Sequence, residues 1–481
     1  MSTKTENTFQ EIISHAKEYG FVFQSSEIYD GLSAVYDYGP YGSELKKNIR
    51  DYWWKSMTQM HENIVGIDAA IFMHPLTWKA SGHIDNFSDP MIDNRDSNKR
   101  YRVDHLIEGL ADTLKEEGKE EEATALIIQM DQLLAAEDFI SLRELLIDKK
   151  ISCAISGTTN WTEIRQFNLM FSTEIGSVAE EANTIYLRPE TAQGIFVNFL
   201  NVQKTARMKI PFGIAQTGKA FRNEIVARQF IFRMREFEQM EMQFFVRPGT
   251  QKEWYDYWKQ TRLEWHKSLG IPAEKYRYHD HVKLAHYADA ALDIEYEFPF
   301  GFKEVEGIHS RTDFDLKSHQ ALSGKKLQYF DNEINQNYIP YVIETSIGLD
   351  RMFLLILCHS YKQEQWLKED GSADSRVVLS IPASIAPLKL AVLPLTKKDG
   401  LPDIARELMN ECKPAFRCFY EEKDTIGKRY RRQDAIGTPY CVTIDYQTKE
   451  DQTVTIRYRD SMLQERIPIN KVKELVLSNI S

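Results

Sequence analysis

The chain has 481 residues, of which 42% are hydrophobic and 27% are charged, and its formal net charge at pH 7 is −11. This composition is typical of a globular protein of two to four domains that can bury a sizeable core. The acidic balance excludes a protein whose whole surface attracts nucleic acid, so any contact with RNA has to come from local basic patches.

The sequence gives no sign of a membrane or secreted protein. No apolar run approaches the roughly 20 residues of a membrane span, and the polar first twenty residues contain no apolar signal core. Scattered thiols without a secretory signal predict a cytoplasmic location and no membrane association. The five cysteines, none in a C-x-x-C pair, are Cys153, Cys358, Cys412, Cys418 and Cys441.

Residues 39–75 predict a long helix followed by a strand. After a Gly-Pro-Tyr-Gly turn, Ser43 is the expected N-cap, and the strand "VGIDAAIFMHP" ends at Pro75. The helix carries an apolar stripe that fits either a core helix or, because it is large and aromatic, a subunit interface. The stripe consists of Leu45, Ile49, Trp53, Met57 and Met60.

The rest of the chain divides by pattern. Residues 103–150 are helical and strongly acidic, which predicts an inserted subdomain that makes no extended contact with phosphates. Residues 151–357 are mostly strand-like and predict one large antiparallel sheet with helices. A helix, a loop over residues 369–376 and a compact α/β domain from about residue 386 follow.

The segment at residues 220–245, "AFRNEIVARQFIFRMREFEQMEMQFF", predicts a strand, a short break and a longer strand. Arg222 and Glu224 are expected on one face of the first strand. Such a face suits a nucleotide, because arginines bind phosphates in a forked geometry and Phe237 can stack on a base. A surface ladder of ion pairs is the alternative, and it would not need Phe237. In the second strand, the alternate residues expected on the polar face are Arg233, Arg235, Phe237, Gln239, Glu241 and Gln243.

Three further stretches carry polar side chains at strand ends. Glu190 follows a strand in "YLRPETAQG", and Glu304 and Glu306 are expected to share one strand face. Glu344 and Ser346 share another face, before an arginine at a helix start, where the dipole favours anions. Glutamates at strand ends are usually solvated, so the argument depends on several of them in one domain.

One glycine-rich stretch is excluded as a phosphate loop. "GIAQTGKA" has Ala220 where such a loop needs a Ser or Thr hydroxyl as magnesium ligand, and a strand follows it instead of a helix.

Taken together, these motifs resemble those of glycyl-tRNA synthetases of the dimeric class II kind. "FRNE" alone is the general class II pattern, whereas "RPETAQG" combined with "REFEQME" is much more specific. The resemblance extends over nearly the whole chain. It implies an α+β protein that has a class II antiparallel catalytic sheet with helices and a C-terminal α/β anticodon-binding domain. It also implies a homodimer whose interface contains the long helix.

The resemblance implies an ATP site in which Arg222 and Arg351 are catalytic. Arg222 holds the α-phosphate and the substrate carboxylate, Arg351 holds the γ-phosphate, and Glu224 meets the adenine amine. Phe237 stacks on adenine, and Glu304 belongs to the ATP and Mg²⁺ site. The implied ATP-binding residues are Arg222, Asn223, Glu224, Phe232, Arg233, Met234, Arg235, Glu236, Phe237, Glu304, Val305, Gly348, Leu349, Asp350 and Arg351.

The same resemblance implies a glycine site. Glu190, Glu241 and Glu344 surround the ammonium group, and Ser346 closes the space around the α-carbon. The implied glycine-binding residues are Arg102, Glu190, Phe237, Glu238, Gln239, Met240, Glu241, Arg311, Glu344, Thr345, Ser346, Ile347 and Gly348. The implied tRNA-Gly contacts are Lys428, Arg429, Arg431 and Arg432, a basic cluster that charge alone would also allow to be a solvated helix.

The sequence departs from the family pattern at two places. Many relatives carry a C-x-x-C pair near residues 94–100 and another near residue 153, but here the first region reads "DNRDSNKR" and Cys153 is alone. Because four thiolates are the usual structural zinc set, we predict no zinc. The third class II motif also has Asp350 before its arginine, which we interpret as tolerated.

The expected protein is therefore a glycine–tRNA ligase that uses ATP and releases AMP and pyrophosphate. Alternatives are a non-catalytic RNA-binding relative, or a class II synthetase for proline, threonine or serine. The expected domains are residues 1–102, with the dimer helix; 103–150, the acidic insertion; 151–375, the catalytic core; and 386–481, the anticodon-binding domain.

Overall fold

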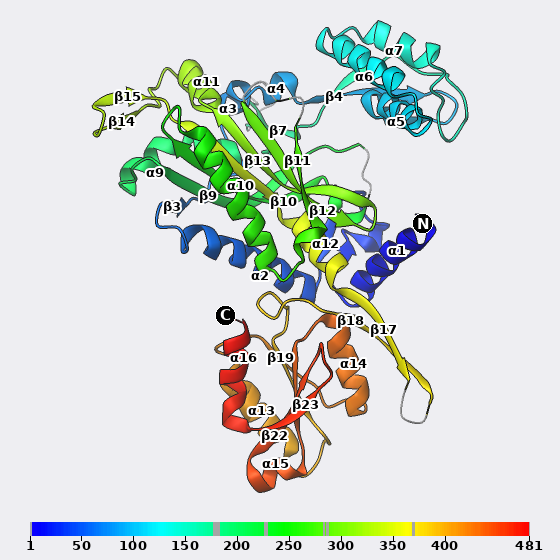
Figure 1. The fold of residues 1–481 in the computed structure, drawn as a ribbon, viewed down its shortest axis with the longest axis vertical. Helices are drawn as coiled ribbons and strands as arrows, with labels where there is room; N and C mark the ends of the chain where they lie inside the picture. The colour runs from blue at the N-terminus through cyan, green and yellow to red at the C-terminus, as the bar shows by residue number, and fades with distance from the viewer. Residues whose placement is uncertain are drawn as a thin grey trace. The chain divides into compact units, whose positions relative to one another are not determined.

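A seven-stranded sheet in the order β11-β12-β13-β16-β10-β9-β3 occupies the middle of the chain's larger unit (Figure 1). Neighbours from β11 to β10 pair antiparallel, and β3 joins β9 in parallel. The prediction of a large antiparallel sheet in an α+β protein is confirmed. The strands are β3 Ile64–Gly66, β9 Phe212–Phe221, β10 Glu236–Val246, β11 Tyr276–Asp280, β12 Ala290–Phe298, β13 Gly301–Thr312 and β16 Tyr341–Gly348.

This computed structural model describes residues 2–176, 183–225, 229–281, 284, 288–367 and 371–480. The chain divides into two units. The first contains Met1–Ala70, Glu190–Ala220 and Gln229–Ser481, and the second contains Ile71–Pro189 and Phe221–Arg228. No described helix is both long enough and apolar enough to cross a bilayer.

Helices cover one face of the large sheet with an apolar core. Met240, Met242 and Phe244 of β10, Ile308 of β13 and Ile347 of β16 pack there against helix side chains. The helices are α1 Ser2–Glu18, α2 Pro40–Thr58, α10 Gln251–Ser268 and α12 Leu349–Ser360. Because strand side chains alternate, the opposite face of the same strands carries the polar set.

Helix α2 differs from expectation in its start and in its role. Gly39 is the N-cap and Pro40 begins the helix, whereas the Ser43 hydroxyl donates back to the Pro40 carbonyl. The stripe side chains Leu45, Ile49, Trp53 and Met57 are fully buried in the chain's own core. They need no second copy to cover them, so the interpretation of this stripe as a subunit interface is wrong. Met60 lies beyond the helix and is exposed.

Smaller elements complete the core of the first unit. The strand predicted up to Pro75 ends at Gly66. Helices α8 and α11 pack over the end of the polar face with Phe196, Leu316 and Phe245. The additional elements are β1 Val22–Gln24, β2 Tyr36–Tyr38, α8 Ala192–Val197, α9 Phe199–Thr205, the 3-10 helix η3 Phe230–Phe232, α11 Phe314–Ser323, β14 Tyr329–Asp331 and β15 Gln336–Tyr338.

The second unit contains a helical subdomain and small sheets. Its strands form the order β5-β4-β6, and β7 pairs with β8. Three helices lie within the stretch predicted to be helical and share a core that includes Ile107, Leu126, Leu146 and Trp161. The elements are α3 Pro75–Ala80, α4 His83–Asn86, β4 Ser88–Asn94, β5 Lys99–Arg102, α5 Val103–Glu116, α6 Glu120–Ala135, α7 Phe139–Asp148, β6 Arg165–Asn168, β7 Ser172–Ile175 and β8 Asn183–Tyr186.

The C-terminal part is a five-stranded sheet in the order β20-β19-β21-β22-β23, with a core of its own. The compact α/β domain predicted here is present. Its elements are β19 Leu390–Pro394, α13 Leu401–Cys412, β20 Cys418–Tyr420, α14 Ile426–Ile436, β21 Tyr440–Ile444, α15 Tyr446–Asp451, β22 Thr453–Tyr458, β23 Gln464–Pro468 and α16 Val472–Ile480.

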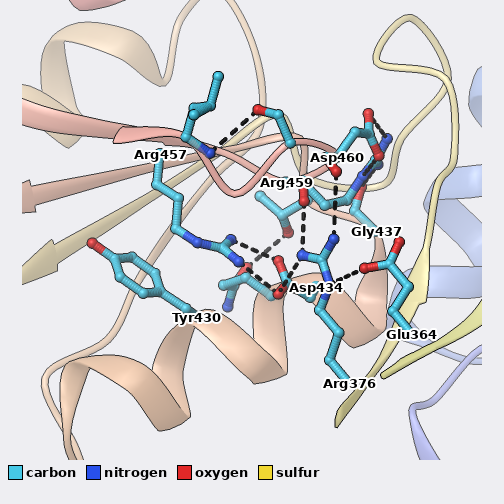
Figure 2. A network of polar contacts seen from close by, with 12 residues as sticks. Glu364, Arg376, Tyr430, Asp434, Gly437, Arg457, Arg459 and Asp460 are labelled. Atoms are coloured by element: carbon cyan, nitrogen blue, oxygen red, sulfur yellow. Dashed lines mark hydrogen bonds and ion pairs between the residues drawn. The ribbon is translucent and has the colours of Figure 1, made fainter. Parts of the chain in front are cut away.

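A hairpin of β17 Tyr361–Leu367 and β18 Ala373–Leu379 precedes this domain, where a loop was predicted. Arg376 of the hairpin and Arg457 of β22 both direct their guanidinium groups at the buried Asp434 of α14 (Figure 2). The nitrogen–oxygen distances are 3.0 Å and 2.7 Å. Two guanidinium groups compensate the buried carboxylate and hold the hairpin against α14.

Candidate active site

The polar face of the large sheet places its functional side chains in rows across neighbouring strands. The pairing register aligns Glu241 of β10 with Ser346 of β16, Gly307 of β13 and Asp293 of β12. The next row contains Gln243, Glu344 and His309. The alternation predicted for residues 237–243 is therefore confirmed, because β10 is regular there.

Three glutamates, Glu190, Glu241 and Glu344, form what we name the carboxylate cluster. Glu241 is 3% exposed and accepts hydrogen bonds from the hydroxyls of Thr191 and Ser346, the latter at 2.7 Å. Gln193 donates to Glu190 at 2.9 Å. The charges of Glu190 and Glu344 both act on Glu241. Three carboxylates in a largely buried place favour a cationic ligand.

Glu344 is held from three sides. Gln243 and Arg311 donate to one of its oxygens at 2.8 and 3.0 Å, and Nδ1 of His309 lies 2.7 Å from the other. Arg311 also makes two hydrogen bonds to Asp315, at 2.8 and 3.0 Å. Its guanidinium thus bonds two carboxylates and holds Glu344 in place, and the substrate contact expected of Arg311 stays a prediction.

The two central carboxylates differ in protonation. Burial, together with the charges of Glu344 and Glu190, raises the pKa of Glu241. Burial also acts on Glu344, but Arg311 and His309 outweigh it and lower the pKa of Glu344. Glu344 is accordingly a fixed negative charge, whereas Glu241 binds a proton readily until a cation displaces it.

Glu304 and Glu306 do not share a face, contrary to the prediction. The register between β12 and β13 shifts between Ile294 and Glu295, so Glu306 pairs with Ile294 but Glu304 pairs with Glu295. The fully buried Glu306 has the parity of the core residue Ile308 and points toward α10, where it bonds Arg262 at 2.6 Å and His266 at 2.8 Å, whereas the β-bulge moves Glu304 off this face. Glu304 remains with the polar residues.

Arg351 and Glu304, both predicted for the ATP site, form an ion pair of 2.8 Å at the N-terminal turn of α12. Arg351 also donates to the backbone carbonyls of Phe232 and Glu304, and its guanidinium lies over the Phe232 ring. A phosphate arriving here would meet a guanidinium and a helix N-terminus together.

Several residues predicted to bind ATP or glycine have side chains in the core. Strand alternation, and the bulge in the case of Val305, turn them away from the polar face. Thr345 is buried, and Glu238 bonds Lys46 and Arg50 of α2. The side chains of Thr345, Glu238 and the core residues below therefore point away from a ligand on the polar face. The core side chains are Met234, Met240, Val305, Ile347 and Leu349.

The unusual Asp350 has a structural explanation. It is 2% exposed and accepts hydrogen bonds from the Lys46 ammonium at 2.6 Å, the Tyr38 hydroxyl and the Glu238 backbone N–H. It therefore joins α12, α2 and β10. Its side chain is committed to these contacts.

Two of the predicted arginines precede strand β10 instead of lying on it. The strand begins at Glu236, after η3, and Arg233 is extended backbone next to that helix. Arg235 donates from its backbone N–H and its guanidinium to the carbonyls of Ala34 and Ser33. Phe237 packs, half-buried, against the core.

The second unit contains Arg102, Arg222, Asn223 and Glu224. β9 ends at Phe221, so Arg222 and Glu224 lie in a loop and not on a strand face as predicted. The Arg222 side chain donates to the Pro189 carbonyl at 3.1 Å. Arg102 bonds two carboxylates, those of Asp89 and Asp104.

The basic helix α14 differs from expectation at Arg429. This guanidinium is 1% exposed and donates to the backbone carbonyls of Pro394, Leu395 and Glu421. Arg431 pairs with Asp374, and Arg432 pairs with Glu421 and Asp424. Lys428 is exposed. Arg429 is therefore wrong as a direct RNA contact, because its side chain is buried and both terminal nitrogens donate inside the domain.

Sequence reasoning missed His309, Thr191 and Gln193. His309 could have been found, because it has the parity of Arg311 on the same strand. Thr191 and Gln193 follow Glu190 within the quoted "RPETAQG" stretch.

Family models match three parts of the chain. The tRNA synthetase class II core domain (G, H, P, S and T) matches residues 171–360, and the anticodon binding domain matches residues 389–479. Glycyl-tRNA synthetase insertion domain 1 matches residues 89–126 and 119–169, which is wider than the insertion predicted from charge.

Curated relatives align over nearly the full length. The glycine–tRNA ligase of Chlorobaculum tepidum is 52% identical over 98% of this chain and 99% of its own. Those of Treponema denticola and Borreliella burgdorferi are both 51% identical, over 96% and 98% of this chain and 94% and 97% of theirs. The chain belongs to the glycine–tRNA ligase family. This family membership excludes the alternative of a synthetase for proline, threonine or serine.

Proposed function

We propose that the protein activates glycine with ATP to glycyl-adenylate and transfers glycine to the 3′ end of tRNA-Gly. The carboxylate cluster is the observation that carries the substrate assignment. Glycine offers an ammonium and a carboxylate but no side chain, so recognition has to act on the ammonium and on the absence of anything larger. Glu344 supplies a fixed charge, and Glu241 accepts the ammonium once its proton has left.

Selectivity against larger amino acids is assigned to Ser346. Its hydroxyl is fixed by Glu241 at 2.7 Å, on the same face as Glu344. A side chain held in this way can occupy the place where a methyl group would project. Exclusion by a small space is effective because a larger substrate clashes, whereas a smaller one loses only contacts.

The ATP part of the proposal assigns the γ-phosphate to Arg351, the α-phosphate to Arg222 and adenine stacking to Phe237. The Glu304 carboxylate, beside Arg351, is an oxygen ligand of the kind Mg²⁺ prefers. Mg²⁺ supplies charge neutralisation to the phosphates when it is bound. Arg351, held by Glu304 and two carbonyls, is preoriented for the leaving pyrophosphate.

The reaction needs no covalent nucleophile from the enzyme. A glycine carboxylate oxygen forms a bond to the α-phosphorus, and the bond from that phosphorus to the bridging oxygen breaks, releasing pyrophosphate. The oxygen of a terminal-ribose hydroxyl then bonds to the glycyl carbonyl carbon, the bond from that carbon to the phosphate oxygen of AMP breaks, and AMP and the hydroxyl proton are released. Catalysis consists of positioning and charge stabilisation, and loss of one such donor costs about 3 kcal/mol of transition-state stabilisation.

The expected domain functions and assembly are part of the proposal. The C-terminal domain binds tRNA, residues 103–150 form an insertion, and the enzyme acts in the cytoplasm as a single-chain-type homodimer. With the α2 stripe buried within the chain, the dimer proposal rests on the family resemblance alone. A monomer mass in solution at micromolar concentration would reject it.

Amino-acid-dependent exchange of pyrophosphate into ATP tests the function. Each of the amino acids is supplied in turn, followed by charging of total tRNA. Exchange with glycine alone, and charging of tRNA-Gly alone, is the expected result. Binding of tRNA without exchange for any amino acid would support the alternative of a non-catalytic relative.

A further inference from the structure

Three side chains with metal-ligand chemistry converge beyond the carboxylate cluster. They come from neighbouring parts of the sheet: His281 directly after β11, Asp293 from β12 and His309 from β13. One ligand atom from each lies within 4.8 Å of the ligand atoms of the other two. Nε2 of His281 is 3.0 Å from Oδ2 of Asp293, and the two imidazole centroids are 5.8 Å apart.

Gly307 makes room for this arrangement. It pairs with Asp293 across the strands, and a Cβ placed on it would lie 3.0 Å from Cε1 and 3.3 Å from Nε2 of His309. The same Cβ would lie 3.7 Å from Oδ1 of Asp293. The His309 ring therefore occupies the space above Gly307, and its Nε2 faces the same place as the Asp293 carboxylate.

The orientation of His309 is the one that metal-binding histidines have. A ligating imidazole is usually held through its second nitrogen by a carboxylate or a carbonyl. Here Nδ1 of His309 lies 2.7 Å from Glu344, which leaves Nε2 for a ligand. Glu344 is itself fixed by Arg311 and Gln243, so the imidazole is supported by a rigid set of contacts.

The donor set selects the class of cation. Mg²⁺ and Ca²⁺ take oxygen ligands, whereas imidazole suits first-row transition metals, and two imidazoles with one carboxylate leave coordination positions open. Two ligands at right angles, each about 2.1 Å from a metal, are about 3.0 Å apart. The 3.0 Å between His281 and Asp293 allows such a pair of ligands, and an ordinary ion pair has the same spacing.

We propose that His281, Asp293 and His309 bind a divalent first-row transition cation. This site is distinct from Mg²⁺ at the ATP phosphates and from the thiolate zinc site that the sequence lacks. The cation joins three neighbouring segments of the sheet and, through His309, contacts the carboxylate that anchors the proposed glycine ammonium. Binding of the cation itself does not depend on the glycine assignment.

The competing interpretation is two ordinary ion pairs, His281 with Asp293 and His309 with Glu344, that no metal joins. Titration of the full-length protein with Co²⁺ at fixed pH separates the two, followed by the visible absorption of the bound ion and by calorimetry. A single Co²⁺ per chain, with spectral bands of imidazole and carboxylate ligation, is the expected result for the wild type.

Variants and a matched control complete the test. His281→Ala and Asp293→Asn should each weaken Co²⁺ binding by about tenfold or more, by analogy with the effect of ligand-shell changes. His281 is one-third exposed, so its removal does not threaten the fold. The control is His279→Ala, an exposed histidine two residues away that pairs with Glu295 at 3.1 Å, and it should bind Co²⁺ as the wild type does.

Three outcomes would overturn the proposal. The wild type could show no cobalt spectrum and no heat of binding, the His281→Ala protein could bind as tightly as the wild type, or the spectrum could show thiolate ligation. Circular dichroism of each variant, compared with the His279→Ala control, establishes that any loss of binding comes from a folded protein.

Discussion

The Ser346 hydroxyl donates a 2.7 Å hydrogen bond to Oε1 of Glu241 on the adjacent strand, where the two residues are register partners. The orientation of the smaller side chain is therefore set by the carboxylate that the proposed ammonium would meet. Recognition of a charge and exclusion of a methyl group are coupled in one pair of residues.

Ser346→Gly tests this coupling. Removing the side chain opens space for one methyl group, and a methyl contact changes discrimination by roughly 1–3 kcal/mol. We expect the ratio of kcat/KM for glycine to that for alanine to fall about tenfold or more in pyrophosphate exchange, with a smaller loss for glycine. An unchanged ratio would mean that another group excludes the methyl.

The raised pKa of Glu241 predicts how glycine binding depends on pH. Because its pKa is raised, Glu241 keeps a proton above the ordinary carboxyl range of about 4.3 and has to release it to bind the ammonium. We therefore expect KM for glycine to fall as pH rises through the raised pKa of Glu241. The variant Glu241→Gln should have a high KM for glycine, little change in KM for ATP, and a flat pH profile in this range. The same slope in the variant would assign the titration to another group.

The regular strands explain what the sequence could predict. In β10 and β16 side chains alternate strictly, so spacing alone predicts the polar face of β10 for Glu241 and one shared face of β16 for Glu344 and Ser346, whereas only the family resemblance brings the two strands together. The prediction failed where regularity ends. The bulge near Glu304 reverses the alternation, and the end of β9 at Phe221 removes Arg222 from the sheet.

Contacts between residues far apart in the sequence explain the other features that could not be predicted. Asp350 bonds Lys46 and Tyr38, which lie more than 300 positions earlier in the chain, and no local sequence pattern predicts such partners. A basic helix likewise gives no sign of which guanidinium points inward. Arg429 satisfies carbonyls of two other segments, while Lys428, next to it, is exposed.

Zinc at the position of the missing cysteines is predicted to be dispensable. Asn94 accepts from the backbone N–H groups of Asp96 and Ser97, and Thr158 donates to Asp96, so hydrogen bonds join the two loops. Burial raises the pKa of Cys153, but hydrogen bonds from Ser156, Ser97 and Tyr101 outweigh it and lower the pKa to about 6.

We expect chelation, followed by removal of the chelator and return of Mg²⁺, to leave the Tm and the exchange rate of the purified protein unchanged, and Cys153→Ser to remain folded. Tightly bound zinc that is lost together with folding of these loops on chelation, and that Cys153→Ser cannot hold, would contradict the prediction.

The tRNA proposal predicts different effects for neighbouring residues of α14. Lys428→Ala combined with Arg432→Ala should weaken tRNA charging relative to the wild type, less at higher salt because phosphate contacts have been removed, and should leave pyrophosphate exchange nearly intact, because α14 lies in a different domain from the carboxylate cluster. Arg429→Ala should instead lower the Tm, since three backbone carbonyls, one of them in a buried hydrogen bond, lose their donor. If the double variant lost exchange as strongly as charging, the assignment of function to the domain would fail.

Glu304 and Glu306 offer a matched pair, because the same change two positions apart should have opposite consequences. Glu306 is fully buried, and its pKa is lowered, since Arg262 and His266 outweigh the effect of burial. Glu306→Gln leaves Arg262 without its charged partner, and breaking a buried ion pair in this way costs about 3–5 kcal/mol of unfolding free energy. The stability that the Glu306 charge contributes is present above the ordinary carboxyl pKa and is lost as pH falls through the lowered pKa, so the Tm difference between wild type and variant should shrink in acid.

Glu304→Gln removes a half-exposed partner of Arg351, so its Tm should remain close to that of the wild type. Its expected defect is in activity, because Arg351 loses the contact that orients it and the proposed magnesium ligand is gone. Thermal unfolding and pyrophosphate exchange, measured on both variants, decide the matter. A stable Glu306→Gln protein would contradict the structural role of Glu306. A Glu304→Gln protein with full exchange activity would contradict the catalytic role of Glu304.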